Sequence, residues 1–93
     1  MTNYISGRRL EYKAKEELEK NKYVVIRASG SHGVFDLIAI RHDIIRLIQI
    51  KKTRKKVSYG KEIEGISKLD VPKSCRKELW IWEFRKGWKK LMI

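Results

Sequence analysis

Two apolar segments joined by a very short polar stretch constrain this chain more than any other feature. Val34 to Ile40 is almost unbroken in apolar residues, and Ile44 to Lys51 is a second such run. Runs of this length, rich in branched residues, are typical of buried β-strands. Only Arg41, His42 and Asp43 separate them. This spacing predicts a tight antiparallel hairpin with His42 and Asp43 as its two turn residues.

Each of the two expected strands carries a polar residue inside its apolar run. The predicted turn sets Asp36 opposite Gln49, and opposed residues in an antiparallel pair share a face. Residues two apart on a strand also share a face, so Lys51 joins this pair while Ile48 and Ile50 point away. A lone carboxylate in an apolar strand is costly unless it is paired. A divalent cation held by Asp36 and the Gln49 amide oxygen would pair it, which makes a nuclease metal site the leading interpretation.

The composition favours a nucleic-acid partner. The 93 residues predict a single domain, 1–93, with one modest core, so a deep substrate cleft is expected to involve a second subunit. Lys and Arg number 23 against 11 Asp and Glu, giving a net charge of +12. A polyanion is the natural partner for such a chain. The lysine-rich surface of a heat-adapted protein is the alternative, but such surfaces usually balance Lys with Glu.

Other classes of protein are disfavoured by what the sequence lacks. There is no long apolar span and no basic amphipathic helix with a separate lipid-facing side, so no membrane association is expected. No signal peptide is recognisable, which makes a cytoplasmic setting the default expectation. Cys75 is the only cysteine, so an internal disulfide and a cysteine-cluster zinc site are excluded.

The residues before the hairpin predict one helix and one strand. Gly7 to Asn21 is expected to be helical, with Glu11 beside an apolar seam at spacings of four. That seam consists of Leu10, Ala14 and Leu18. Tyr23 to Arg27 has the composition of a strand. Ala28 to Gly33 is a small-residue loop that suits close approach to a phosphate, although a plain strand connection explains it equally well.

The residues after the hairpin predict a basic run, a second helix and two strands. Lys51 to Lys56 holds five basic residues in six, which indicates either a solvated charge run or a phosphate contact beside the polar patch. Tyr59 to Leu69 is expected to be a helix that ends before Pro72. Its inward residues would be Ile63, Ile66 and Leu69. Lys77 to Phe84 and Trp88 to Ile93 are expected to be strands.

Three tryptophans fall in these last strands. Trp80, Trp82 and Trp88 are more often core or dimer packing than base-stacking platforms. Together with Leu91 and Ile93 they exceed what so short a chain can bury alone, which predicts a dimer. The order αβββαββ predicts an α/β fold with a mixed five-stranded sheet flanked by helices.

The chemistry of phosphodiester hydrolysis assigns a role to each patch residue. The reaction needs an activated water, a cation that stabilises charge on the phosphate, and oxygen ligands for that cation. Asp36 is the expected anchor, and Lys51 could orient the attacking water. Glu11 could add an outer oxygen if the first helix packs across the sheet near Asp36.

The same residues resemble the PD-(D/E)XK nuclease superfamily, and most closely the archaeal Holliday-junction resolvases. The similarity is carried by RRLE at 8–11, YVVIRASGS at 23–31, FDLIA at 35–39 and LIQIK at 47–51. It covers Gly7 to about Lys56, and beyond that only the order of elements agrees. It implies a restriction-endonuclease-like fold and a single nuclease domain that acts on DNA as a homodimer and cuts two strands of a four-way junction symmetrically.

The resemblance also implies roles for individual residues. Glu11, Asp36 and Gln49 would surround Mg²⁺, for which Mn²⁺ is a possible substitute. Lys51 would serve the attacking water, and Ser31 would support the site from its loop. Further residues are expected to contact DNA, by the resemblance or by their basic character: Arg8, Arg9, Arg27, Lys52, Arg54, Lys55 and Lys56. His32, close to Asp36 in sequence, could touch phosphate or move a proton, although a lone loop histidine is most often a surface residue.

One residue departs from the resolvase pattern. Gln49 stands where these resolvases have glutamate, so the site has one negative charge fewer and a weaker metal ligand. The transposon end-cleaving nucleases look similar in carrying glutamine there and are active. Two alternatives to a junction resolvase therefore stay open. The first is a nucleic-acid-binding module that kept the fold and lost catalysis, and the second is a related nuclease of duplex ends, mismatches or specific sequences.

Overall fold

The sheet of this protein has the mixed five-stranded architecture that the sequence predicts. The computed structural model describes residues 7–28, 33–53 and 58–93. Its elements, in chain order, are α1 (Gly7–Lys20), β1 (Val24–Arg27), β2 (Leu37–Arg41), β3 (Ile44–Thr53), α2 (Gly60–Ser67), β4 (Cys75–Glu83) and β5 (Gly87–Met92). The strands lie in the order β1-β2-β3-β4-β5. All neighbours are antiparallel except β3 and β4, which are parallel.

The central hairpin has the predicted turn and register. Leu37 pairs with Ile48 and Arg41 with Ile44, so His42 and Asp43 form the turn. His42 adopts a positive φ of 52°, which a two-residue hairpin turn requires of at least one residue. The register on this hairpin is the one that sets Asp36 opposite Gln49.

The strand β2 begins later than predicted. It starts at Leu37 instead of Val34, whereas every other boundary lies within two residues of the expected one. The backbone hydrogen bonds between β2 and β3 stop here because Ile50 N–H donates to a side-chain oxygen, Asp36 Oδ2, at 2.7 Å, and not to a backbone carbonyl of β2. The two preceding residues, Val34 and Phe35, instead pack against the cluster beneath α2.

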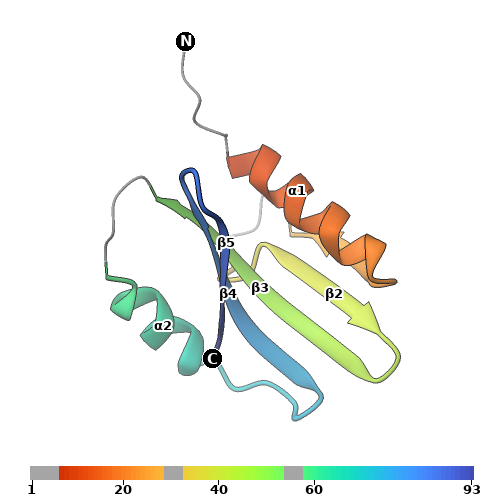
Figure 1. Ribbon diagram of the computed structural model, residues 1–93. Coiled ribbons are helices and arrows are strands. Elements are labelled where there is room, and N and C mark those ends of the chain that lie inside the picture. The colour runs from red at the N-terminus through yellow and green to blue at the C-terminus, as the bar shows by residue number, and fades with distance from the viewer. Residues whose placement is uncertain (1–6, 29–32, 54–57) are drawn as a thin grey trace.

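The two helices cover opposite faces of the sheet (Figure 1). On the α1 face, Ala14 and Leu18 of the predicted seam pack against residues of the strands β1 to β4, and Leu10 is buried as well. These sheet residues are Val25, Leu37, Ala39, Ile48 and Trp80. On the α2 face, Ile66 packs against Leu79 and Ile81.

The second helix buries less than predicted. Ile66 is fully buried, but Ile63 is 37% exposed, so the expectation that Ile63 points inward is wrong. The helix is short and contacts β4, so Ile66 is its only residue in the core. Leu69 lies beyond the end of α2 and is half-buried.

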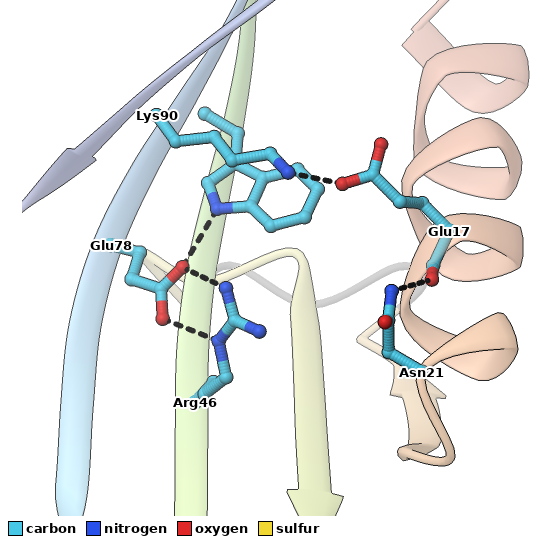
Figure 2. Close-up of polar contacts among 6 residues, drawn as sticks. Glu17, Asn21, Arg46, Glu78 and Lys90 are labelled. Atoms are coloured by element: carbon cyan, nitrogen blue, oxygen red, sulfur yellow. Dashed lines mark hydrogen bonds and ion pairs between the residues drawn. The ribbon is translucent and has the colours of Figure 1, made fainter.

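A charged network that no sequence pattern predicts lies on the α1 face. Glu78 is fully buried. Its carboxylate accepts bonds from Arg46 Nε at 2.6 Å and Nη2 at 2.8 Å, and from the Trp80 indole N–H at 2.8 Å. Figure 2 shows these bonds beside a second pair, in which Lys90 of β5 contacts Glu17 of α1. The buried carboxylate is therefore fully partnered, as a charge in a core must be.

The three tryptophans form a cluster around this network. Trp88 meets Trp80 and Trp82 edge-on, at centroid distances of 5.4 and 5.1 Å. Trp80 is fully buried, and the other two are half-buried. Core packing is thus the structural role of Trp80, as the sequence favoured.

Part of the α2 face remains uncovered. Val25 is buried on the α1 face, so its neighbours Val24 and Ile26 point to the other face, where Val24 pairs with Ile40. Val24 is 66% exposed, Ile26 is 50% exposed and Ile40 is 37% exposed. We call these three residues the open sheet face. Within residues 7–28, 33–53 and 58–93, no helix is long and apolar enough to cross a membrane.

Candidate metal and nucleic-acid site

The carboxylate of Asp36 is held at the point where β2 and β3 separate. The backbone N–H of Asp36 donates to Ile48 O at 2.8 Å, and the backbone carbonyl of Asp36 accepts from Ala28 N–H at 2.9 Å. Its Oδ2 accepts the Ile50 N–H. The main chain and one oxygen are therefore fixed, and no hydrogen bond from a described residue reaches the other oxygen.

A cavity of about 230 Å³ opens beside this carboxylate. Its lining brings together three residues from separate elements: Glu11 from α1, Asp36, and Lys51 from β3. Lys52 also lines it, and Gly7, Leu10 and Ile50 complete the wall. The condition that α1 packs across the sheet near Asp36 is met, so Glu11 reaches the predicted patch.

The Glu11 carboxylate is held by Arg27, at the end of β1. Arg27 donates to Glu11 Oε1 from both Nε at 3.3 Å and Nη2 at 3.0 Å. Its third nitrogen, Nη1, donates to the Tyr12 hydroxyl at 3.0 Å, and the guanidinium lies 4.4 Å from the centroid of the Tyr12 ring. The sequence predicts that Arg27 contacts DNA backbone, but in the structure each of its nitrogens bonds within the protein.

Gln49 lies on the strand between these residues but outside the cavity lining. Its Oε1 is buried and has no hydrogen-bond partner, a state that it shares with Tyr59 Oη. A buried oxygen without a partner costs free energy unless a cation, a water or a donor reaches it. Gln49 Oε1 is therefore available to accept a hydrogen bond or bind a cation. The structure does not, however, place Gln49 in the cavity lining with Glu11, Asp36 and Lys51.

The three predicted ligands share a pattern of available oxygens. Asp36 and Glu11 each have one oxygen anchored and one without a hydrogen bond from the described residues, and Gln49 Oε1 is without a partner. Carboxylate and amide oxygens are the ligands that Mg²⁺ and Mn²⁺ take in proteins. The oxygens of Glu11 and Asp36 in the cavity thus fit a hard divalent cation, whereas Gln49 Oε1 offers a further oxygen from outside the cavity lining. With only two carboxylates here, the described residues contain no group of three His, Cys, Asp or Glu that could hold a metal.

The electrostatics of the site raise the pKa of Asp36. Burial raises this pKa above its ordinary value of 3.8, and the negative charge of Glu11 raises it further. The Ile50 N–H and the positive charge of Lys51 act in the opposite direction. Both charged neighbours, Glu11 and Lys51, therefore affect the pKa of Asp36, and an added cation would favour the ionised carboxylate.

The predicted DNA contacts are only partly visible. Arg8 and Arg9 are exposed on the first turn of α1, and Lys52 lies in the cavity wall. The other predicted residues, Ser31, His32, Arg54, Lys55 and Lys56, lie outside the described residues. Tyr12 was missed by sequence reasoning. Its only signal was its place next to Glu11, and a tyrosine on a charged helix face is ordinarily a surface residue.

Comparison with known proteins finds similarity in structure and none in sequence. No family model matches the chain, and no curated protein matches it in sequence. Hjc of Archaeoglobus fulgidus, a Holliday junction resolvase from an archaeal hyperthermophile, is similar in structure, with a TM-score of 0.70 at 22% sequence identity. The similarity covers 90% of this chain and 73% of that one. As its resemblance to the PD-(D/E)XK nucleases predicts, the chain therefore has the restriction-endonuclease-like fold of an archaeal Holliday junction resolvase.

Proposed function

We propose that this protein is a divalent-metal-dependent DNA endonuclease that cuts four-way junctions as a homodimer. The observation that carries the proposal is the convergence of Glu11, Asp36 and Lys51 on one cavity. Two carboxylates can hold a divalent cation and an amine can orient the attacking water, which are tasks that metal-assisted phosphodiester hydrolysis sets. The junction preference is supported by the fold shared with Hjc and by the resemblance at positions 8–51.

Each residue has a definite task in this proposal. Glu11, Asp36 and Gln49 would hold Mg²⁺ or Mn²⁺, and the bound cation would supply positive charge to the scissile phosphate and make the attacking water more acidic. Lys51, which lines the cavity, would orient the water and offset negative charge that develops on the phosphate. Ile50 N–H keeps the Asp36 carboxylate in place for this task.

DNA would bind through the basic surface around the cavity. Lys52 lines the cavity, Arg8 is exposed on the first turn of α1, and Arg54, Lys55 and Lys56 follow β3 in the sequence. We expect binding to weaken with salt, with log K falling against log salt by about 0.9 per phosphate contacted. Titrations of a labelled junction at several NaCl concentrations measure this slope. A flat response would remove the electrostatic argument.

The open sheet face supports the homodimer. A sheet with apolar residues on both faces is stable in water only when both faces are covered. Val24, Ile26 and Ile40 leave one such face exposed, and a second copy would cover it. A dimer also places two cavities on one DNA molecule, as paired incisions require.

Cleavage of a defined junction tests the function. An end-labelled four-way junction and a matching linear duplex are incubated with the protein in Mg²⁺, Mn²⁺ or EDTA. We expect paired, symmetrical cuts in the junction alone, and only with metal. Asp36→Asn and Lys51→Met should abolish them, whereas Asp43→Asn, in the turn at the far end of the same hairpin, should cut like the parent.

A nucleic-acid-binding module without catalysis is the second candidate. The observation that favours it is Gln49, which leaves only two carboxylates among the described residues of the site. Under this alternative, the parent binds the junction but cuts neither DNA with any metal. Calorimetric titration with Mn²⁺ then separates the two candidates, since a module without catalysis has no need to bind metal.

A further inference from the structure

The ion pair between Arg27 and Glu11 has no task in the proposed chemistry so far. We propose that Arg27 is a positioning residue that fixes the Glu11 carboxylate through one oxygen and leaves the other free for the divalent cation. This inference rests on the proposed function. It replaces the expectation that Arg27 contacts the DNA backbone.

The hydrogen bonds are arranged as a positioning role requires. Both Arg27 donors, Nε and Nη2, converge on the same atom, Glu11 Oε1, and no described residue donates to Oε2. A guanidinium that served only to neutralise the carboxylate would ordinarily engage both oxygens in the bidentate fork. Arg46 does so with Glu78 in this same protein. Arg27 thus satisfies one Glu11 oxygen twice and leaves the second one open.

The guanidinium is itself held in place. Tyr12 accepts a hydrogen bond from Nη1 and stacks its ring against the same group. The Arg27 and Glu11 side chains are only 16% and 22% exposed, so solvent screens this pair less than a surface pair. Arginine suits such a task because its planar donors keep a fixed geometry.

Arg27 also links the two carboxylates, which come from different parts of the chain. It is the last residue of β1 and pairs with Leu37, directly after Asp36. The next residue, Ala28, donates its N–H to the Asp36 carbonyl. The same short segment therefore fixes the backbone of Asp36 and the side chain of Glu11.

Calorimetric titration of the intact protein with Mn²⁺ tests this inference without relying on cleavage. Arg27→Met removes the donors and keeps the length of the side chain. We expect Mn²⁺ affinity to fall about tenfold or more, the usual effect of losing a group that orients a metal ligand. Arg27→Lys keeps the charge but not the two convergent donors, so it should recover little. Arg76→Met, which removes one charge from an exposed position of β4 that pairs with Arg46 and not with the cavity residues of β3, is the matched control and should bind Mn²⁺ like the parent.

A second variant keeps the test valid if Arg27→Met does not fold. Tyr12→Phe removes the hydroxyl that holds Nη1 and keeps the ring. It should fold like the parent, because Tyr12 is largely exposed, and should weaken Mn²⁺ binding by a smaller factor than Arg27→Met. Circular dichroism of each variant confirms folding before titration.

The outcomes distinguish this inference from the proposed function. If the parent binds Mn²⁺ and folded Arg27→Met binds it equally well or more tightly, the positioning role is wrong. Loss of junction affinity in that variant, with Mn²⁺ affinity unchanged, would return Arg27 to the DNA-binding set. If the parent binds no Mn²⁺, the metal-dependent function itself fails, and the positioning role with it.

Discussion

At the scale of single residues, the candidate site was only partly predictable. Asp36 and Lys51 follow from the length of the hairpin turn, because the turn alone sets the register. Gln49, expected beside them, is not among the residues that line the cavity, whereas Ile50, expected to point away, is one of them. Glu11 depended on how α1 packs across the sheet, which the seam of the helix indicates but does not fix. The contact between Arg27 and Glu11 was not predictable, since it requires the distance between the end of β1 and the first turns of α1.

The raised pKa of Asp36 gives a prediction for stability. Between 3.8 and the raised pKa, the folded protein binds more protons than the unfolded chain, so the free energy of unfolding falls as the pH rises through that interval. Ionised Asp36 therefore destabilises the metal-free protein at neutral pH. Asp36→Asn keeps an acceptor for Ile50 N–H and removes the charge.

Thermal unfolding in EDTA measures this effect. Asp36→Asn should melt above the parent at pH 7, and the difference should disappear below pH 3.8, where both side chains are neutral. Added Mn²⁺ should raise the melting temperature of the parent alone, because only the parent retains both carboxylates of the proposed metal site. A variant that melts below the parent at pH 7 in EDTA would contradict this account.

Gln49 gives a second prediction at the same scale. Gln49→Glu should tighten Mn²⁺ binding by about tenfold, because the number of charged ligands sets the affinity of such sites. In EDTA it should lower the melting temperature, since it adds a negative charge near Asp36. Calorimetry and thermal unfolding check the two effects. An unchanged Mn²⁺ affinity would show that the side chain at position 49 does not reach the cation.

At the scale of elements, local connections were predictable and distant ones were not. The antiparallel β2–β3 pair is joined by two residues, and its register was predicted correctly. The parallel β3–β4 pair is joined by a long crossover through α2, and no local signal sets Ile48 beside Glu78. For this reason the ion pair between Arg46 and Glu78 could not be predicted, although both residues lie in segments that were predicted as strands. The exposure of Ile63 has a similar cause, because it depends on where α2 meets β4.

The Arg46–Glu78 pair predicts a large loss of stability when it is broken. Arg46→Met leaves the fully buried Glu78 carboxylate without its bidentate partner, and this should cost about 3–5 kcal/mol. Urea unfolding at neutral pH measures the cost. Lys15→Met, which breaks the surface pair with Glu19, is the control and should cost less than about 1 kcal/mol. Equal losses in the two variants would show that burial does not strengthen the Arg46–Glu78 pair.

At the scale of the whole molecule, a strongly basic surface coexists with an apolar patch. The net charge of +12 opposes association between copies, so a dimer must rest on contacts that carry no charge. The open sheet face offers such contacts. The sequence predicted a dimer from apolar residues of the last strands, but Trp80 among them is fully buried within one chain.

Substitutions at two equally exposed residues test which surface forms the dimer contact. Ile40, on the open sheet face, and Ile63, on α2, are each 37% exposed. Ile40→Lys should shift the protein from dimer to monomer at micromolar concentration, while Ile63→Lys should leave the dimer intact. Sedimentation velocity measures both. A parent that sediments as a monomer, or a dimer that survives Ile40→Lys, would contradict this placement.

The parallel pairing of β3 with β4 also affects the order of folding. The hairpin closes a loop of two residues, whereas Lys51 must find Ile81 across the whole crossover, and such distant pairing is slow because loop closure costs entropy before any contact forms. The hairpin is therefore expected to form early, with Asp36 and Lys51 already on neighbouring strands. Docking of β4 then becomes the slow step, and until it occurs the apolar edge of β3 is exposed. In the folding chain, Asp36 and Lys51 are therefore brought together before the sheet is complete, whereas Glu11 joins them only when α1 packs across it.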